Sequence, residues 1–131
     1  HGSQNGIICH APDAKINIAD LQERVRLVPS MDGQDIAKTV STRRPYIWPE
    51  SASHSRHVVV VDYGVKHNIL RCLSQKGLRL TVVPCDIPAE EILKLRPDGI
   101  FLSNGPGDPS ATGVYAVPVV QSLLKTGLPL F

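Results

Sequence analysis

Several features that mark particular classes of protein are missing from this sequence of 131 residues. It has only three cysteines, and no two of them have the C-x-x-C spacing that zinc sites and redox motifs use. Aromatic residues make up 5% of the chain, and no apolar run approaches the roughly 20 residues that cross a bilayer. We therefore expect no disulfide framework, no metal site and no membrane span, and the cysteine content fits a reducing cytoplasm best.

A large excess of one charge is also missing. The 14 Lys and Arg residues outnumber the 12 acidic residues by two, and the charges are spread evenly along the chain. No basic stripe indicates a nucleic-acid partner. No charged stretch followed by an apolar core opens the sequence, so we expect no signal peptide. With 42% hydrophobic and 20% charged residues, the composition is typical of a soluble globular protein.

The first part of the chain, residues 1–50, has weak periodicity. Residues 45–56 contain two prolines followed by three serines, which predicts an exposed linker and a domain boundary. Before this linker, the pattern predicts one short strand and two helical stretches. These lie at residues 6–9, 13–25 and 32–40.

Residues 57–131 show a clear alternation of strands and helices. The run of four valines at 58–61 is typical of a strand buried on both faces of a parallel sheet. Strand and helix alternate three times, which predicts an α/β doubly wound sheet with ligands at the carboxyl ends of its strands. The strands are expected at 57–62, 78–83, 99–102 and from 128, the helices at 66–76, 88–95 and 114–125, and the loop of interest at 103–113.

The string S-N-G-P-G-D-P at residues 103–109 follows a predicted buried strand. Gly105 and Gly107 permit positive φ angles and close approach of a ligand to the backbone, while the prolines stiffen the loop. Successive N–H groups in such a turn can hold an anion or an oxyanion. The string has neither the spacing nor the lysine of a P-loop. On its residues alone, a simple turn between a strand and a helix is favoured.

Several strings occur together and in order, among them D-Y-G-V-K-H-N-I at 62–69, P-D-G-I at 97–100 and S-N-G-P-G-D-P at 103–109. With these strings the chain resembles the small subunits of carbamoyl-phosphate synthases, which are class I, triad-type glutamine amidotransferases. The resemblance covers nearly all of residues 58–131. It extends more loosely to the earlier part of the chain, through Q-N-G at 4–6 and P-S-M at 29–31.

The resemblance implies a mechanism and two site residues. In the family, a cysteine thiolate attacks the side-chain amide of glutamine, and a histidine oriented by a glutamate moves the protons. The first glycine of the string, here Gly105, supplies an oxyanion-hole N–H group, and the second, Gly107, lines the glutamine site. The nucleophile follows the strand that starts at Leu128. We therefore expect the catalytic Cys, His and Glu beyond Phe131 and expect the chain alone to be inactive.

The resemblance also implies partners and an organisation. L-Glutamine is the expected substrate and a large subunit the expected partner. That subunit takes the ammonia and, with bicarbonate, ATP and Mg, makes carbamoyl phosphate for arginine and pyrimidine biosynthesis. We expect no cofactor in this chain. Residues 1–44 would end the amino-terminal domain of the small subunit, 45–56 would be the linker, and 57–131 would begin the amidotransferase domain, a truncated doubly wound sheet.

Three other interpretations stay open. The chain could belong to another triad amidotransferase, of the anthranilate or GMP synthase type, although those typically lack the N-G-P-G-D-P spelling. It could be a non-enzymatic, flavodoxin-like module that binds an anion through residues 103–109. It could also be a structural module that docks a partner subunit through residues 1–56.

The remaining cysteines and histidines are expected to be structural. Cys72 is predicted as a small core residue of a helix, and Cys85 follows a strand; neither lies in a strand–turn–helix elbow. We therefore predict no Cys–His dyad within this chain. The histidines considered for such a dyad are His10, His54, His57 and His67.

Asp62 ends the first predicted strand of the sheet, where a carboxylate can serve as a phosphorylation or metal site. It is followed by Tyr63 and Gly64 without a second acidic residue beside it. A role in hydrogen bonding the loop is therefore favoured.

Overall fold

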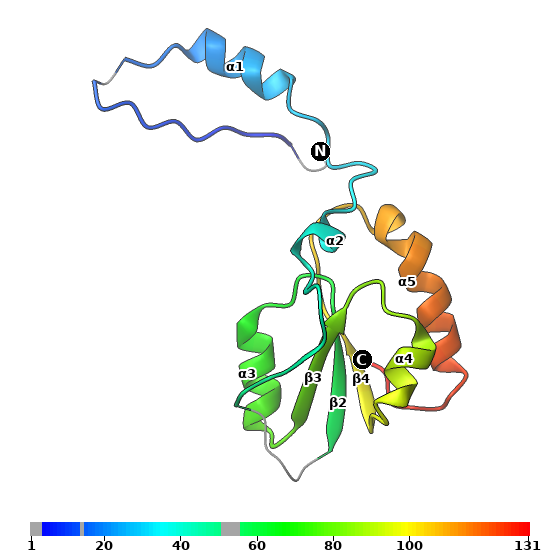
Figure 1. Ribbon diagram of the computed structural model, residues 1–131. Coiled ribbons are helices and arrows are strands. Elements are labelled where there is room, and N and C mark those ends of the chain that lie inside the picture. Colours follow the sequence, from blue (N-terminus) through cyan, green and yellow to red (C-terminus); the bar gives the residue numbers. More distant parts are fainter. Residues whose placement is uncertain (1–3, 14, 51–55) are drawn as a thin grey trace.

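The computed structural model describes residues 4–13, 15–50 and 56–131 (Figure 1). The later part of the chain forms an α/β domain around a four-stranded sheet with the order β1-β3-β2-β4. Before it, an arm that carries the helix α1 (Ile18–Arg26) extends away from the sheet (Figure 1). The α/β class expected from the sequence is confirmed.

Strand β2 (His57–Asp62) lies in the middle of the sheet. It pairs in parallel with β3 (Arg79–Pro84) on one side and with β4 (Gly99–Leu102) on the other. The predicted parallel core of the sheet is therefore confirmed. Three helices complete the domain: α3 (His67–Gln75), α4 (Ala89–Lys94) and α5 (Pro109–Leu124).

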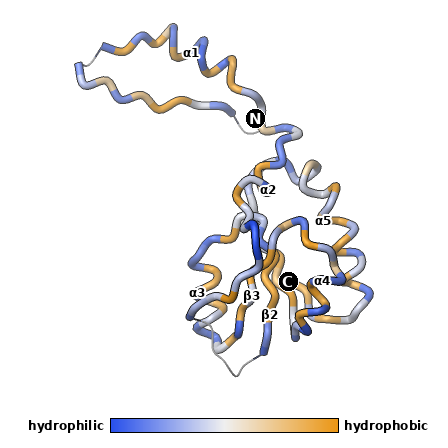
Figure 2. The backbone as a smooth tube through the Cα atoms, viewed as in Figure 1, coloured by the Kyte–Doolittle hydropathy of each residue, from blue (hydrophilic) through white to orange (hydrophobic). Residues whose placement is uncertain are grey.

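Alternate side chains of β2 pack into two separate hydrophobic clusters. Val59 and Val61 share one cluster with Ile92 of α4, while Val60 shares the other with Leu70 of α3. Because successive side chains of a strand point to opposite faces, these contacts place α3 on one face of the sheet and α4 on the other. In Figure 2 the strands carry hydrophobic colours between the helices, as the run of valines predicts.

The predicted exposed linker at residues 45–56 is wrong for its first part. Residues 46–47 form β1 (Tyr46–Ile47), which pairs antiparallel with β3 and makes the sheet mixed. Trp48 follows with only 8% of its surface exposed, and its backbone N–H group donates to the carbonyl of Leu80 at 3.1 Å. Burial of this indole brings the neighbouring residues onto the sheet edge. Residues 51–55 lie outside the described residues, and the domain boundary stays a prediction.

Residues 6–9 do not form the predicted short strand. The sheet contains no strand from this part of the chain, and the side chain of Ile8 is fully exposed, at 101%. The prediction is wrong because β propensity reflects packing against neighbouring strands, and no such neighbour lies beside these residues in the described chain.

The two helices of the N-terminal part are shorter than predicted. Helix α1 begins after Asn17, whose side chain accepts the N–H group of Asp20 at 3.2 Å. Residue 14, within the predicted stretch, lies outside the described residues. Helix α2 (Ile36–Val40) begins after Asp35, which caps the N–H group of Lys38 at 3.2 Å. Both starts follow the usual preference for Asn and Asp at the N-cap position.

Helix α5 begins at Pro109 rather than at residue 114, so the loop after β4 is shorter than predicted. The carboxylate of Asp108 accepts the N–H group of Ser110 at 2.8 Å and caps the helix. Pro109 occupies the first turn, where its missing N–H group is not needed. None of the helices in the described ranges is long and apolar enough to cross a membrane.

The last residues run beside β4, where the fourth strand was predicted to begin. Leu130 forms a parallel bridge with Ile100, and the N–H group of Phe131 donates to the carbonyl of Ile100 at 3.0 Å. The ring of Phe131 stacks on Phe101 with 5.5 Å between centroids. A strand in this place is therefore begun, although only one bridge is formed.

Candidate functional site

The loop at residues 103–108 connects β4 to α5 at the carboxyl end of the sheet. Its first residue is bonded to the neighbouring strand β2: the N–H group of Ser103 donates to the carbonyl of Val61 at 3.1 Å. The hydroxyl of Ser103 accepts the N–H group of Tyr63 at 2.9 Å. Near the other end of the loop, Gly107 has a φ of 96°, which L residues with side chains rarely adopt. The loop conformation is thus set by sheet contacts at one end and by a glycine at the other.

Gly105 lies so close to the backbone of Tyr63 that no side chain fits between them. A Cβ atom on Gly105 would be 2.9 Å from both the carbonyl carbon and the Cβ of Tyr63, and it would overlap the carbonyl oxygen. Gly64, on the opposing loop, has a φ of 120°, and a Cβ there would be 2.9 Å from Cδ of Pro106. The loops after β2 and β4 therefore pack closely: position 105 needs glycine because of the Tyr63 backbone, and position 64 because of its positive φ and the ring of Pro106.

A pocket of about 260 Å³ lies between this loop and α5. Both predicted site residues, Gly105 and Gly107, line it, and within the described part of the chain their N–H groups donate to no acceptor. These two N–H groups are therefore available to a bound group. The pocket is lined by Ala37, Tyr63, Leu102, Ser103, Gly105, Pro106, Gly107, Pro109, Thr112, Gly113, Ala116 and Val120.

The lining of this pocket carries no charged side chain. Burial raises the pKa of Tyr63 to about 12, so its hydroxyl stays neutral at physiological pH. The N–H groups of Gly33 and Ser110 lower the pKa of Asp108, which stays ionised at the end of the loop without lining the pocket. Proteins usually hold phosphate dianions with Arg or Lys. A neutral lining with free N–H donors suits an uncharged polar group or a developing oxyanion better.

The cysteines do not form a second site. Cys72 is exposed on α3, so its prediction as a core residue is wrong, because the buried Leu70 marks the side of the helix that faces the sheet. Cys85 is buried, with 3% exposure, as predicted. Among the hydrogen bonds of the described residues, none joins a cysteine to a histidine. His54 lies outside the described residues.

His57 and Asp62 have the structural roles that the sequence favours. Nε2 of His57 lies 2.8 Å from the hydroxyl of Thr81 in the sheet, and the histidine is buried. The carboxylate of Asp62 accepts the N–H groups of Gly64 at 2.9 Å and Val65 at 2.8 Å. Its other oxygen accepts a third N–H group from residue 42 at 2.8 Å. Nowhere in the described ranges does a group of three or more His, Cys, Asp or Glu side chains have the arrangement to hold a metal ion.

Sequence reasoning missed a set of contacts between the loop and residues 33–38, which we call the strap. The N–H group of Asp108 donates to the carbonyl of Gln34 at 3.0 Å, and the carboxylate of Asp108 accepts the N–H group of Gly33 at 2.7 Å. One available signal was the string D-P-S at 108–110, which is typical of a helix start. It predicts α5 correctly but gives no indication of the distant strap.

Comparison with known proteins extends these observations. The chain matches the family described as glutamine amidotransferase class-I over residues 59–131. Curated relatives named carbamoyl phosphate synthase small chain include those of Mesorhizobium japonicum, 50% identical over 99% of this chain, and Halomonas eurihalina, 46% identical over 99%. Another, from Rhizobium meliloti, is 44% identical over the whole chain.

These matches include the arm and the strap as well as the α/β domain. The chain spans only about a third of the length of these relatives, between 35% and 38% of each. The family match covers more than half of the chain and includes β4, the 103–108 loop and α5. The chain therefore belongs to the class I glutamine amidotransferase family.

Proposed function

We propose that this chain is part of the glutamine-hydrolysing small subunit of a carbamoyl-phosphate synthase and forms one wall of its glutamine site. The observation that carries the proposal is the uncharged pocket with two free glycine N–H groups at the carboxyl end of the sheet. The names of the relatives, matched along nearly the entire chain, support the choice of this enzyme within the family.

In this proposal, Gly105 and Gly107 act through their backbones. The N–H group of Gly105 stabilises the oxyanion that forms when a thiolate attacks the glutamine amide, and Gly107 lines the site beside it. The close packing of Gly105 on Tyr63 supports this role, because it holds the N–H group in place before substrate arrives. The thiolate, its histidine and its glutamate come from residues outside this chain.

The wider organisation follows from the same proposal. Residues 1–44 end a smaller amino-terminal domain, 45–56 connect it, and 57–131 begin a doubly wound amidotransferase domain. The partner is a large subunit that receives ammonia and carries ATP and Mg, and the protein acts in the cytoplasm. Its product, carbamoyl phosphate, supplies arginine and pyrimidine biosynthesis.

The alternatives are less well supported. A flavodoxin-like anion-binding module would be expected to bring Arg or Lys to the pocket, whereas its lining is uncharged. Another triad amidotransferase would account for residues 59–131 but not for relatives that are similar over the arm as well. A docking role for residues 1–56 is compatible with the proposal, since a small subunit binds a large one.

The test is glutamine hydrolysis by the whole protein that carries this chain, measured as ammonia release. We expect the whole protein to be active and the 131-residue chain alone to be inactive. Alanine keeps the backbone N–H group, but its Cβ clashes with Tyr63 and must displace that group from the oxyanion. Gly105→Ala in the whole protein should therefore reduce kcat by about 100-fold, the effect of losing one oxyanion donor. Ammonia release by the chain alone, or full activity in Gly105→Ala, would contradict the proposal.

A further inference from the structure

We propose that Asp108 and Asp35 are positioning residues that hold the strap across the 103–108 loop and thereby fix Gly107 at the pocket. This inference rests on the proposed function for its link to glutamine, but its contacts stand on their own. Four observations carry it: the bonds of Asp108, the packing of Gly107, the bonds of Asp35 and the placement of Lys38.

Asp108 joins three segments at once. One carboxylate oxygen caps α5 through the N–H group of Ser110 at 2.8 Å, and the other accepts the N–H group of Gly33 at 2.7 Å. The backbone N–H group of Asp108 donates to the carbonyl of Gln34 at 3.0 Å. The strap is therefore bound to the loop by two bonds at the residue that follows Gly107.

Gly107 packs directly against the backbone of the strap. A Cβ atom there would be 2.7 Å from the carbonyl oxygen of Gln34 and 2.9 Å from the backbone nitrogen of Ile36. These are backbone atoms, which cannot turn aside as a side chain can. The position of Gly107, and of the wall that it gives the pocket, consequently depends on the position of the strap.

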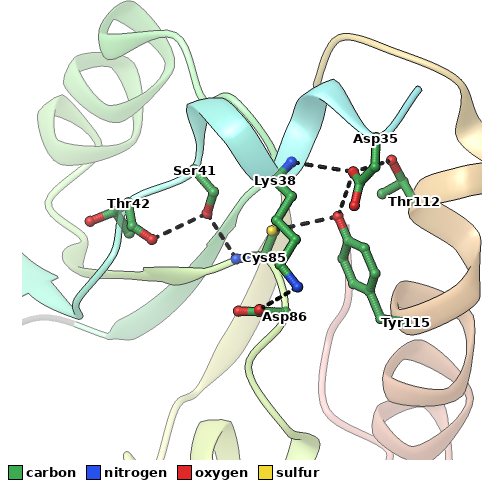
Figure 3. Close-up of polar contacts among 8 residues, drawn as sticks. All are labelled: Asp35, Lys38, Ser41, Thr42, Cys85, Asp86, Thr112 and Tyr115. Atoms are coloured by element: carbon green, nitrogen blue, oxygen red, sulfur yellow. Dashed lines mark hydrogen bonds and ion pairs between the residues drawn. The ribbon is translucent and has the colours of Figure 1, made fainter.

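Asp35 holds the middle of the strap to α5, as Figure 3 shows. Its Oδ1 accepts the hydroxyl of Tyr115 at 3.0 Å and that of Thr112 at 3.4 Å, one turn earlier on the same helix. Burial, together with Cys85 and Asp35, raises the pKa of Tyr115, which keeps its hydroxyl protonated as a donor. Thr112 itself lines the pocket, so this contact lies directly behind the pocket wall.

Lys38 holds the far end of the strap, at the loop after β3. Its Nζ lies 3.1 Å from the carboxylate of Asp86 and 5.6 Å from the ring centroid of Tyr115 (Figure 3). Both Lys38 and Asp86 are exposed, so the ion pair contributes little to stability by itself. It does, however, place the side chain of Lys38, within α2, beside the loop after β3.

Asp108→Asn separates the strap contact from the helix cap. Asparagine is a good N-cap residue, so its one carbonyl oxygen keeps the bond to Ser110, and its amide NH₂ is left facing the N–H group of Gly33. Asp32→Asn is the matched control, since the carboxylate of Asp32 accepts only the hydroxyl of Ser30, at 2.9 Å, among the described residues. Tyr115→Phe is a second test variant, which removes the hydroxyl that donates to Asp35 of the strap.

Two measurements are made on each variant. The first is hydrogen exchange of the backbone amide at position 108, and the second is glutamine hydrolysis, both in the whole protein that carries this chain. For Asp108→Asn we expect exchange about tenfold faster, the usual effect of losing a hydrogen bond to a charged group. We expect KM for glutamine to rise about fivefold or more, with kcat within about twofold, since a displaced wall weakens binding. Tyr115→Phe should change both in the same direction, and Asp32→Asn should change neither.

A purely structural role of these residues would speed amide exchange while leaving KM unchanged, and that result would overturn the proposal. It would equally be overturned if Asp108→Asn and Tyr115→Phe behaved like Asp32→Asn in both measurements. If the whole wild-type protein fails to hydrolyse glutamine, the proposed function is wrong, and the amide exchange alone then decides whether the strap fixes the loop.

Discussion

Substitution of Gly105 by alanine tests the backbone-to-backbone packing on which the candidate site is built. The added Cβ would lie 2.9 Å from two carbon atoms of Tyr63 and would overlap its carbonyl oxygen. Two of these three atoms belong to the backbone, so no change of rotamer relieves the contact, and one of the two loops must move. Overpacking of this kind costs about 1–3 kcal/mol. For a chain of this length we take about 4 °C per kcal/mol, so Tm should fall by about 4–12 °C.

Thermal unfolding followed by circular dichroism is the assay, and Gly113→Ala is the matched control. Gly113 lines the same pocket from α5, but a Cβ there would meet only Cγ2 of Val117, at an ordinary 3.7 Å. Within a helix, alanine is more stable than glycine by about 1 kcal/mol, so this variant should melt a few degrees higher. The packing argument is refuted if Gly105→Ala melts at or above the temperature of the unchanged chain.

Three further outcomes are expected of the chain. Leu70→Ala should reduce the free energy of unfolding by about 2–5 kcal/mol in chemical denaturation, because the side chain is fully buried between α3 and the sheet; a loss below 1 kcal/mol would contradict this packing. Burial lowers the pKa of His57 below 6.5, so the unfolded chain binds more protons than the folded chain, and the free energy of unfolding should fall as the pH drops below about 6.5. His57→Gln should remove that pH dependence. The same pH profile in the variant and in the unchanged chain would contradict the assignment to His57. A thiol reagent should label the exposed Cys9 and Cys72 rapidly and the buried Cys85 only on unfolding, which a time course of labelling in native buffer would check.

The elements that sequence reasoning located well are those whose signals are local. The four valines of 58–61 determine both the position and the burial of β2, and the glycine at 64 ends it. The string at 103–109 predicted a site loop, and its two glycines do line a pocket. The binding of glutamine in this pocket stays a prediction.

The features that were missed depend on contacts between distant residues. Strand β1 forms because Trp48 is buried against the sheet, which its flanking prolines and serines gave no reason to expect. The bond between Asp35 and Tyr115 spans 80 residues, so no periodicity in either segment reveals it. Cys72 was misplaced because its side of α3 depends on which face of the helix meets the sheet.

The burial of Trp48 has a spectroscopic consequence. It is the only tryptophan in the sequence, it is held on the sheet by β1, and its ring packs edge-on against His67 with 5.4 Å between centroids. Its fluorescence should therefore be emitted at short wavelength while β1 is docked and shift to longer wavelength when that edge detaches and water reaches the indole. The chain thus contains a built-in optical probe of its mixed sheet edge, separate from the parallel core and from the pocket.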